Sequence, residues 1–285
     1  MTEIVSQRRR RRFIVRNAPS QVLRLEWGAA TDVGLRRRVN EDSVVAMAGI
    51  YAVADGLGGH AAGDVASQAA VTHLARAARR RWATGSILQH DDVEDALLAA
   101  TADIAAVTVD QESGGGTTVT GIAVVEYDGV PALQVFNIGD SRVYQLSGGA
   151  LTQVTTDHSF VQELVDSGQL APELAEFHPD ANVITRALGF GETPQVDRWI
   201  AHPRVGARIL VCSDGLTREL SRTAIRSILI AGAGPQDTAN ALVEAAVSAG
   251  GRDNVTVAVV DVLDAPDFSD TITEPLRAVP EPDST

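Results

Sequence analysis

Four aspartates share one setting in the sequence, because each borders an apolar run and stands beside a glycine or another turn residue. They are Asp55, Asp140, Asp214 and Asp253. A carboxylate at the end of a buried strand can point into a cleft, where a neighbouring glycine lets a ligand approach the backbone closely. Carboxylate oxygens suit Mg²⁺ or Mn²⁺, and a divalent ion offsets the repulsion that raises the pKa of clustered carboxylates. The four positions therefore allow a divalent-metal site, although a single Asp-Gly pair is most often only a turn.

Short apolar runs separated by turn residues predict the strands that would position these aspartates. The predicted strands cover residues 23–28, 44–54, 117–126, 133–138, 143–146, 208–212 and 254–262. Helical periodicity predicts helices over residues 62–82, 91–109, 160–168, 223–230 and 237–249. Several strands follow one another without a helix between them. This order favours an α+β sandwich in which helices cover antiparallel sheets, and it disfavours a parallel βαβ sheet.

Composition and charge exclude several classes of protein. The 285 residues are 45% hydrophobic and 21% charged, which is typical of a soluble globular protein. The net charge of -13 would repel nucleic acid and anionic lipid, so a phosphate-bearing substrate needs a local cationic or metallic site. No run approaches the ~18 apolar residues of a membrane helix. The single cysteine, Cys212, cannot form an internal disulfide, and we expect a cytoplasmic protein.

The two ends of the chain differ in composition from its centre. Residues 1–22 are basic, contain proline and show no period of two or 3.6, which predicts a disordered arm. Residues 263–285 are acidic and poor in large apolar side chains, which predicts a disordered tail. We therefore expect one catalytic domain over residues 23–262.

A series of motifs then becomes recognisable in one order along the chain. They are Gly34-Leu35-Arg36-Arg37-Arg38-Val39-Asn40-Glu41-Asp42, Ala54-Asp55-Gly56-Leu57-Gly58-Gly59-His60, Gly116-Thr117-Thr118, Gly139-Asp140-Ser141, Asp157-His158-Ser159, Thr185-Arg186-Ala187-Leu188-Gly189, Ser213-Asp214-Gly215 and Asp253-Asn254-Val255. Each motif alone is weak evidence for a family, but the whole set in this order resembles the metal-dependent protein phosphatases of the protein phosphatase 2C type. The resemblance covers about residues 25–262.

The resemblance implies a set of metal ligands. In that family the matching aspartate bridges two Mn²⁺ or Mg²⁺ ions, which assigns Asp55 to the bridge and the Gly56 carbonyl to the second ion. Asp214 and Asp253 match the aspartates that complete the shell of the first ion. In bacterial relatives the positions of Asp140 and Asp214 help to hold a third, weaker ion.

The resemblance also implies residues that act on substrate or on metal-bound water. Asp42 matches an aspartate that acts largely through metal-bound water, and Glu41 stands beside it. Arg37 aligns with the arginine that binds the substrate phosphate, although an arginine flanks it on either side and the alignment is uncertain by one residue. His60 aligns with a candidate general acid for the leaving alkoxide, and the alternative is a turn histidine without a proton-transfer role.

The family further implies a fold and a function. It predicts a four-layer αββα sandwich with two antiparallel sheets, and a substrate-shaping flap over about residues 155–191. Within the flap, His158, His178 and Arg186 either contact a phosphopeptide or fix the flap, and we favour the structural role. The implied reaction is hydrolysis of phosphoserine and phosphothreonine in proteins by metal-activated water, which opposes a serine/threonine kinase. We expect a monomer that binds no nucleic acid.

Two other functions compete with this one. Cys212 and Arg218 have the spacing of the phosphate loop in cysteine-dependent phosphatases. However, Asp214 would place a carboxylate in that loop, and no histidine precedes the cysteine, so we reject it. The second alternative is a catalytically inactive domain of the same fold that binds phosphoproteins, and the presence of the full set of metal-site aspartates argues against it.

Overall fold

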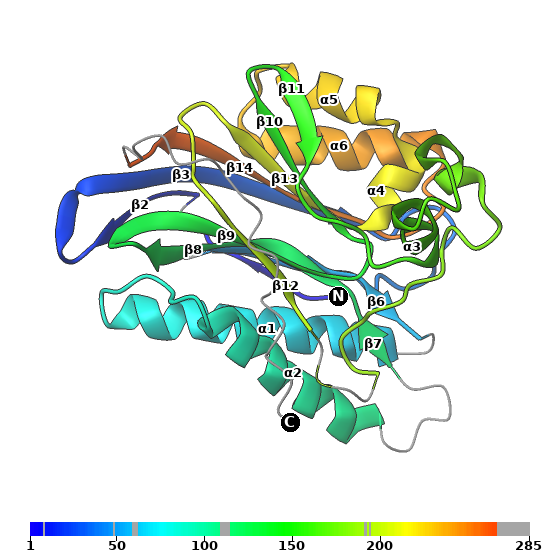
Figure 1. The fold of residues 1–285 in the computed structure, drawn as a ribbon, viewed down its shortest axis with the longest axis horizontal. Helices are drawn as coiled ribbons and strands as arrows, with labels where there is room; N and C mark the ends of the chain where they lie inside the picture. Colours follow the sequence, from blue (N-terminus) through cyan, green and yellow to red (C-terminus); the bar gives the residue numbers. More distant parts are fainter. Residues whose placement is uncertain are drawn as a thin grey trace.

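Two stacked β-sheets form the centre of the molecule, and helices cover the outer face of each sheet (Figure 1). The computed structural model describes residues 1–7, 9–47, 49–58, 62–108, 115–190, 193 and 195–266. Within these residues each of the two large sheets has six strands, and a third sheet has two. This arrangement confirms the predicted αββα sandwich. None of the described helices is both long enough and apolar enough to span a membrane.

The first large sheet carries the N-terminal helices. Its strand order is β1 (Glu3–Val5), β4 (Ser43–Met47), β5 (Ile50–Ala54), β8 (Val119–Tyr127), β9 (Val130–Ile138) and β12 (Asp197–Ala201). All neighbours are antiparallel except β1 and β4, which are parallel. Helices α1 (Ala62–Ala83) and α2 (Asp92–Thr108) pack on the outer face. The buried side of α1 is rich in alanine, which lets the helix approach the sheet closely.

The second large sheet carries the C-terminal helices. Its strand order is β11 (Ala150–Gln153), β10 (Arg142–Ser147), β13 (Arg208–Cys212), β14 (Val255–Asp264), β3 (Ala18–Asp32) and β2 (Arg10–Val15), all antiparallel. Helices α4 (Asp214–Glu219), α5 (Arg222–Ile230) and α6 (Pro235–Ala249) lie on its outer side (Figure 1). The flap region contains α3 (Phe160–Asp166) and the 3₁₀ helix η1 (Pro172–Phe177).

The strands are apolar on both faces because each sheet is buried on both sides. On β14, Val257 and Val259 pack against the helices, while Ala258 and Val260 face the other sheet. This alternation follows from the two-residue period of a strand. Continuous apolar runs therefore mark these strands in the sequence, rather than an alternation of apolar and polar residues.

The predicted metal-site aspartates lie where strands of the two sheets end or begin. Asp55 directly follows β5. Asp140 and Asp214 come two residues after β9 and β13, and Asp253 stands two residues before β14. The two-stranded sheet of β6 (Gly56–Leu57) and β7 (Gly116–Thr117) lies directly after Asp55. The sandwich thus presents these carboxylates from several strands, as the sequence predicts.

The prediction of a disordered arm over residues 1–22 is wrong for the described part of that range. Strands β1 and β2 lie there, and β3 begins at Ala18. Phe13 and Val15 are buried between the sheets, whereas Arg12 and Ile14, which precede them in alternation along the strand, are exposed. Five consecutive arginines conceal this alternation, because an arginine on a strand can lay its apolar stem against the protein while its charge stays in water. At the other end, β14 runs to Asp264, and the predicted tail from residue 267 lies outside the described residues.

We expect the change Phe13→Ala to lower the free energy of unfolding by about 3 kcal/mol, because it removes a fully packed ring from the core. Ile14→Ala on the same strand is the matched control, since Ile14 is 41% exposed and Phe13 only 2%. Denaturant unfolding of both variants measures the difference. Equal small losses in the two variants would mean that the N-terminal strand does not pack against the domain.

Candidate functional site

The backbone of Asp55 is fixed by hydrogen bonds to Thr117 and Thr118. Its amide donates to Thr118 Oγ1 at 3.1 Å. Its carbonyl accepts from the Thr118 amide and from Thr117 Oγ1, each at 2.9 Å. These three bonds explain why threonines follow the glycine of the Gly116-Thr117-Thr118 motif.

Gly56 lies where the site approaches the first turn of α1. A Cβ atom at this position would come within 2.5 Å of the Gly63 backbone and 2.7 Å of the Glu41 carbonyl oxygen. Any side chain would therefore push the helix and the Glu41 loop away from Asp55. The requirement for glycine here is steric, since its φ lies outside the left-handed region.

Asp42 is completely buried between the two sheets. Ser213 Oγ donates to Asp42 Oδ2 at 2.9 Å and accepts from the Thr256 amide at 3.0 Å. Ser213 therefore links the Asp42 carboxylate to β14 and to the start of α4. The second oxygen, Oδ1, has no hydrogen-bond partner.

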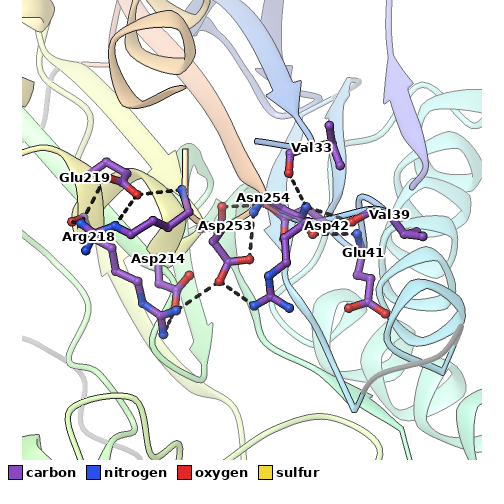
Figure 2. Close-up of polar contacts among 12 residues, drawn as sticks. Val33, Val39, Glu41, Asp42, Asp214, Arg218, Glu219, Asp253 and Asn254 are labelled. Carbon is purple, nitrogen blue, oxygen red and sulfur yellow. Dashed lines mark hydrogen bonds and ion pairs between the residues drawn. The ribbon is translucent and has the colours of Figure 1, made fainter. Parts of the chain in front are cut away.

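Asn254 ties the loop that carries Arg37 to the beginning of β14 (Figure 2). Its side-chain amide donates to the carbonyls of Val33 and Val39 at 2.9 and 3.0 Å, and its Oδ1 accepts from the Glu41 amide at 2.9 Å. The Asn254 amide donates to Asp253 Oδ1 at 2.9 Å. Asn254 thus fixes both sides of the contact between the loop and Asp253.

Two arginines meet at Asp253. Arg37 Nη2 donates to Asp253 Oδ2 at 2.8 Å, and Arg218 Nη1 donates to the same oxygen at 3.2 Å. Arg218 also forms an ion pair with Asp214 Oδ2 (Figure 2). Hydrogen bonds of the described residues join neither Arg36 nor Arg38 to this carboxylate.

Asp140 belongs to a tight turn that is fixed to the flap. Gly139 has a φ of +104°, and a Cβ there would lie 2.6 Å from the Thr118 side chain. The Gly139 amide donates to His158 Nδ1 at 3.0 Å, and the His158 amide donates back to the Gly139 carbonyl at 2.9 Å. His158 Nε2 lies 3.1 Å from Asp197 Oδ2, and Arg186 Nη1 lies 3.2 Å from Asp197 Oδ1. These contacts support the structural role that the sequence favours for His158 and Arg186.

Burial and mutual repulsion dominate the electrostatics of the site. Loss of water raises the pKa of Asp42 and of Asp140 to about 7, and the nearby charge of Asp214 adds to both shifts. Desolvation also raises the pKa of Asp55 well above its usual value, with further contributions from Asp42 and Asp214. The pKa of Asp214 is raised by burial as well, although Arg218 opposes the shift. These couplings place the carboxylates in one cluster.

The cluster has the chemistry of a divalent-metal site. Oδ1 of Asp42, of Asp140 and of Asp214 is buried without a hydrogen-bond partner, and each such oxygen needs a cation or a proton. Hard oxygen donors of this kind fit Mg²⁺ or Mn²⁺. Among the described residues, however, three or more His, Cys, Asp or Glu side chains do not form a ready ligand shell. Arginines instead occupy Oδ2 of Asp214 and of Asp253.

The structure brings the predicted carboxylates and Arg37 together, but it does not test every prediction. His60, the candidate general acid, lies outside the described residues. His178 contacts Phe160 and Asp180 within the flap and is 25% exposed. Cys212 is fully buried, and desolvation raises the pKa of its thiol to about 12, which opposes a thiolate nucleophile.

Sequence reasoning misses two residues of the site, Arg218 and Asn254. The sequence shows Arg218 at the spacing of a cysteine loop, but its position four residues after Asp214 on a helix is the signal that indicates the ion pair. The role of Asn254 could not be read from the sequence, because its partners Val33, Val39 and Glu41 lie more than 200 positions away.

Comparisons with known proteins identify relatives over most of the chain. Residues 38–246 match the family model described as Protein phosphatase 2C. The serine/threonine protein phosphatase PstP of Mycobacterium tuberculosis is 42% identical over 246 residues, which are 84% of this chain and 45% of that protein. The protein phosphatase PhpP of Streptococcus pneumoniae is 37% identical over 249 residues, which are 84% of this chain and 98% of that protein. The chain thus spans about half the length of PstP.

Solved structures agree with this assignment. The structure of M. tuberculosis PstP has a TM-score of 0.75 at 40% identity and covers 84% of this chain and 99% of its own. The catalytic domain of PstP in complex with two manganese ions has a TM-score of 0.72 at 40% identity, with the same coverage of both chains.

We expect the metal-free chain to become less stable as the pH rises from about 5 to about 7. The pKa of Asp42 and of Asp140 is about 7 in the folded chain and roughly 3.9 when unfolded. Between these pH values the two carboxyl groups are already deprotonated in the unfolded chain but still hold protons in the folded chain. The free energy of unfolding therefore falls as the pH rises. Unfolding by denaturant in the presence of a chelator measures this slope.

Asp140→Asn should reduce the slope, because it removes one of the titrating groups. Asp128→Asn is the matched control, since Asp128 lies in an exposed turn with a φ of 50° that asparagine also tolerates. Stability that stays level or rises over this range would contradict the electrostatic account.

Proposed function

We propose that this chain, which belongs to the protein phosphatase 2C family, hydrolyses phosphoserine and phosphothreonine in proteins with two Mn²⁺ or Mg²⁺ ions. The observation that carries the proposal is the cluster of buried carboxylates with unpaired oxygens, beside which Arg37 is placed. Phosphomonoester hydrolysis is among the slowest uncatalysed reactions, so the site needs both a nucleophile and strong neutralisation of charge.

The residues that would hold the ions are those of the cluster. Asp55 and the Gly56 carbonyl lie at the end of β5, and Asp214 and Asp253 face them from the second sheet. Asp140 would add a further, weaker ligand position beside Asp214. When bound, a pair of such ions activates a water as nucleophile near neutral pH and neutralises the phosphoryl oxygens.

The chain's own side chains would bind and orient the substrate. Arg37 is half exposed and stands at the rim of the cluster, where its guanidinium can leave Asp253 and grip two phosphoryl oxygens. Asp42 is held by Ser213 and would orient metal-bound water from the buried side. His60 remains a predicted general acid for the leaving alkoxide.

The substrates and partners follow from the same proposal. PstP and PhpP are named as protein phosphatases, which supports phosphorylated proteins as substrates here. We further propose that the chain opposes a serine/threonine kinase, acts as a monomer and works in the cytoplasm. The single cysteine, buried and unpaired, supports a reducing compartment.

Asp55→Asn should abolish metal-dependent turnover, with a loss of at least about a thousandfold, because it removes the proposed bridging charge. The assay uses p-nitrophenyl phosphate and a phosphothreonine peptide with chelator-stripped protein, before and after addition of Mn²⁺. Wild-type activity should return with Mn²⁺ and resist thiol alkylation. Asp128→Asn is the control for loss of an exposed aspartate.

Three results would reject this mechanism. Full activity of Asp55→Asn would remove the residue from the site. Turnover that resists chelator but is lost on alkylation would assign the reaction to Cys212. Binding of the phosphopeptide without any turnover would indicate a binding domain of the same fold.

Arg37→Ala should raise KM about tenfold or more with a smaller effect on kcat, because it removes a charged contact to the substrate phosphate. Arg38→Ala is the matched control, since Arg38 is exposed and has no hydrogen bond to Asp253 among the described contacts. Steady-state kinetics with the phosphothreonine peptide measures both variants. A larger effect of Arg38→Ala than of Arg37→Ala would transfer the role to Arg38.

A further inference from the structure

Arg218 places a positive charge inside the carboxylate cluster. It lies on α4, four residues after Asp214, and its guanidinium forms an ion pair with Asp214 Oδ2. The same guanidinium donates to Asp253 Oδ2 at 3.2 Å (Figure 2). Its charge also opposes the rise in the pKa of Asp140 that burial causes, so Arg218 lies within electrostatic reach of a third carboxylate. One guanidinium thus interacts with three of the proposed metal-site residues.

The backbone of Arg218 is held firmly in this place. Arg252 Nη2 donates to the Arg218 carbonyl at 3.2 Å. The Arg252 amide and Nε donate to Glu219 Oε1 at 2.8 and 2.9 Å. Glu219 is almost completely buried, with 2% of its side chain exposed. The end of α4 is therefore bonded to Arg252, which directly precedes Asp253. The Arg218 side chain, 36% exposed, extends from there over the carboxylate cluster.

The contacts of Arg218 occupy oxygens that a divalent ion would need. Asp253 Oδ1 accepts from the Asn254 amide, and Asp253 Oδ2 accepts from Arg37 and Arg218, so both oxygens are engaged. Asp214 Oδ2 is paired with Arg218, and only Asp214 Oδ1 is without a partner. An ion that takes Oδ2 of Asp214 or of Asp253 must therefore compete with the guanidinium.

We propose that Arg218 is an internal counterion that neutralises Asp214 and Asp253 in the metal-free chain and competes with the divalent ion for them. The inference rests on the proposed function, because it assigns the metal to the same carboxylates. Arg218 stabilises the carboxylates when no metal is bound, and it lowers their affinity for metal by the free energy needed to displace it. It acts on metal loading and is not a group that touches the substrate.

The test is calorimetric titration of the full chain, stripped with chelator, with Mn²⁺ alone. Arg218→Met removes the charge but keeps an unbranched side chain, and it should bind Mn²⁺ about tenfold more tightly than the wild type, which is ~1.4 kcal/mol. Arg218→Lys retains a positive charge and should stay within about threefold of the wild type. Arg10→Met is the matched control, because Arg10 forms an ion pair with Glu26 at 2.6 Å on β2.

Thermal unfolding gives a second readout that does not depend on activity. In chelator, Arg218→Met should unfold at a lower temperature than the wild type, because the paired carboxylates lose their counterion. On addition of saturating Mn²⁺ it should gain more in Tm than the wild type gains. Arg10→Met should lower the Tm in chelator only slightly, as expected for loss of a surface ion pair, and it should gain no more in Tm with Mn²⁺ than the wild type gains.

The outcomes separate this inference from the proposed function. Mn²⁺ binding by Arg218→Met that is equal to or weaker than that of a metal-binding wild type would overturn the counterion role and leave the phosphatase proposal standing. Tighter binding by Arg218→Lys, as large as that of Arg218→Met, would overturn the argument from charge. Absence of Mn²⁺ binding in every variant would overturn both proposals.

Discussion

The constraint on which the site depends is the repulsion among carboxylates that the fold buries together. Asp42, Asp55, Asp140 and Asp214 all lose water, and the pKa of each is raised further by at least one neighbouring carboxylate. A buried charge without a partner is costly, so the cluster can persist only if protons, arginines or metal ions neutralise it. Arg218 and Arg37 neutralise part of this charge through Asp214 and Asp253, and the raised pKa values of Asp42 and Asp140 favour protons on the others; a divalent ion would replace both.

The sandwich resists this repulsion because each carboxylate is attached to rigid backbone. Asp55 is held by two threonines at the end of β5, and Asp42 is held through Ser213. Asn254 closes the ring by fixing the Arg37 loop against the start of β14. The bonds that hold Asp55 and those made by the Asn254 side chain are neutral hydrogen bonds to backbone groups, so they do not depend on the charge state of the cluster. The scaffold thus keeps the donors close while the counterions exchange.

The sequence predicts the layers of the fold and most of the cluster, because both leave local marks. Continuous apolar runs identify strands such as β14, although the single strand predicted over residues 44–54 is divided between β4 and β5, and the strand-end aspartates stand beside turn residues. The N-terminal strands escape prediction, because the arginines from Arg8 to Arg12 hide the alternation that buries Phe13 and Val15. The clamps of Asn254 escape it for another reason, since contacts between distant positions leave no mark in local composition.

Hydrogen bonds join the flap to residues beside the same cluster. His158 exchanges two hydrogen bonds with Gly139, next to Asp140, and its carbonyl accepts from the Thr185 amide at 2.9 Å. A further pair of backbone bonds joins Leu188 to Thr117, which also holds the Asp55 carbonyl. The segment between these anchors carries α3 and η1 and exposes Phe177 and Leu174. A protein substrate that contacts this segment would therefore act on a structure bonded at both ends to residues that position the proposed metal-site aspartates. Under the proposed function, substrate choice and metal geometry would depend on the same hydrogen bonds.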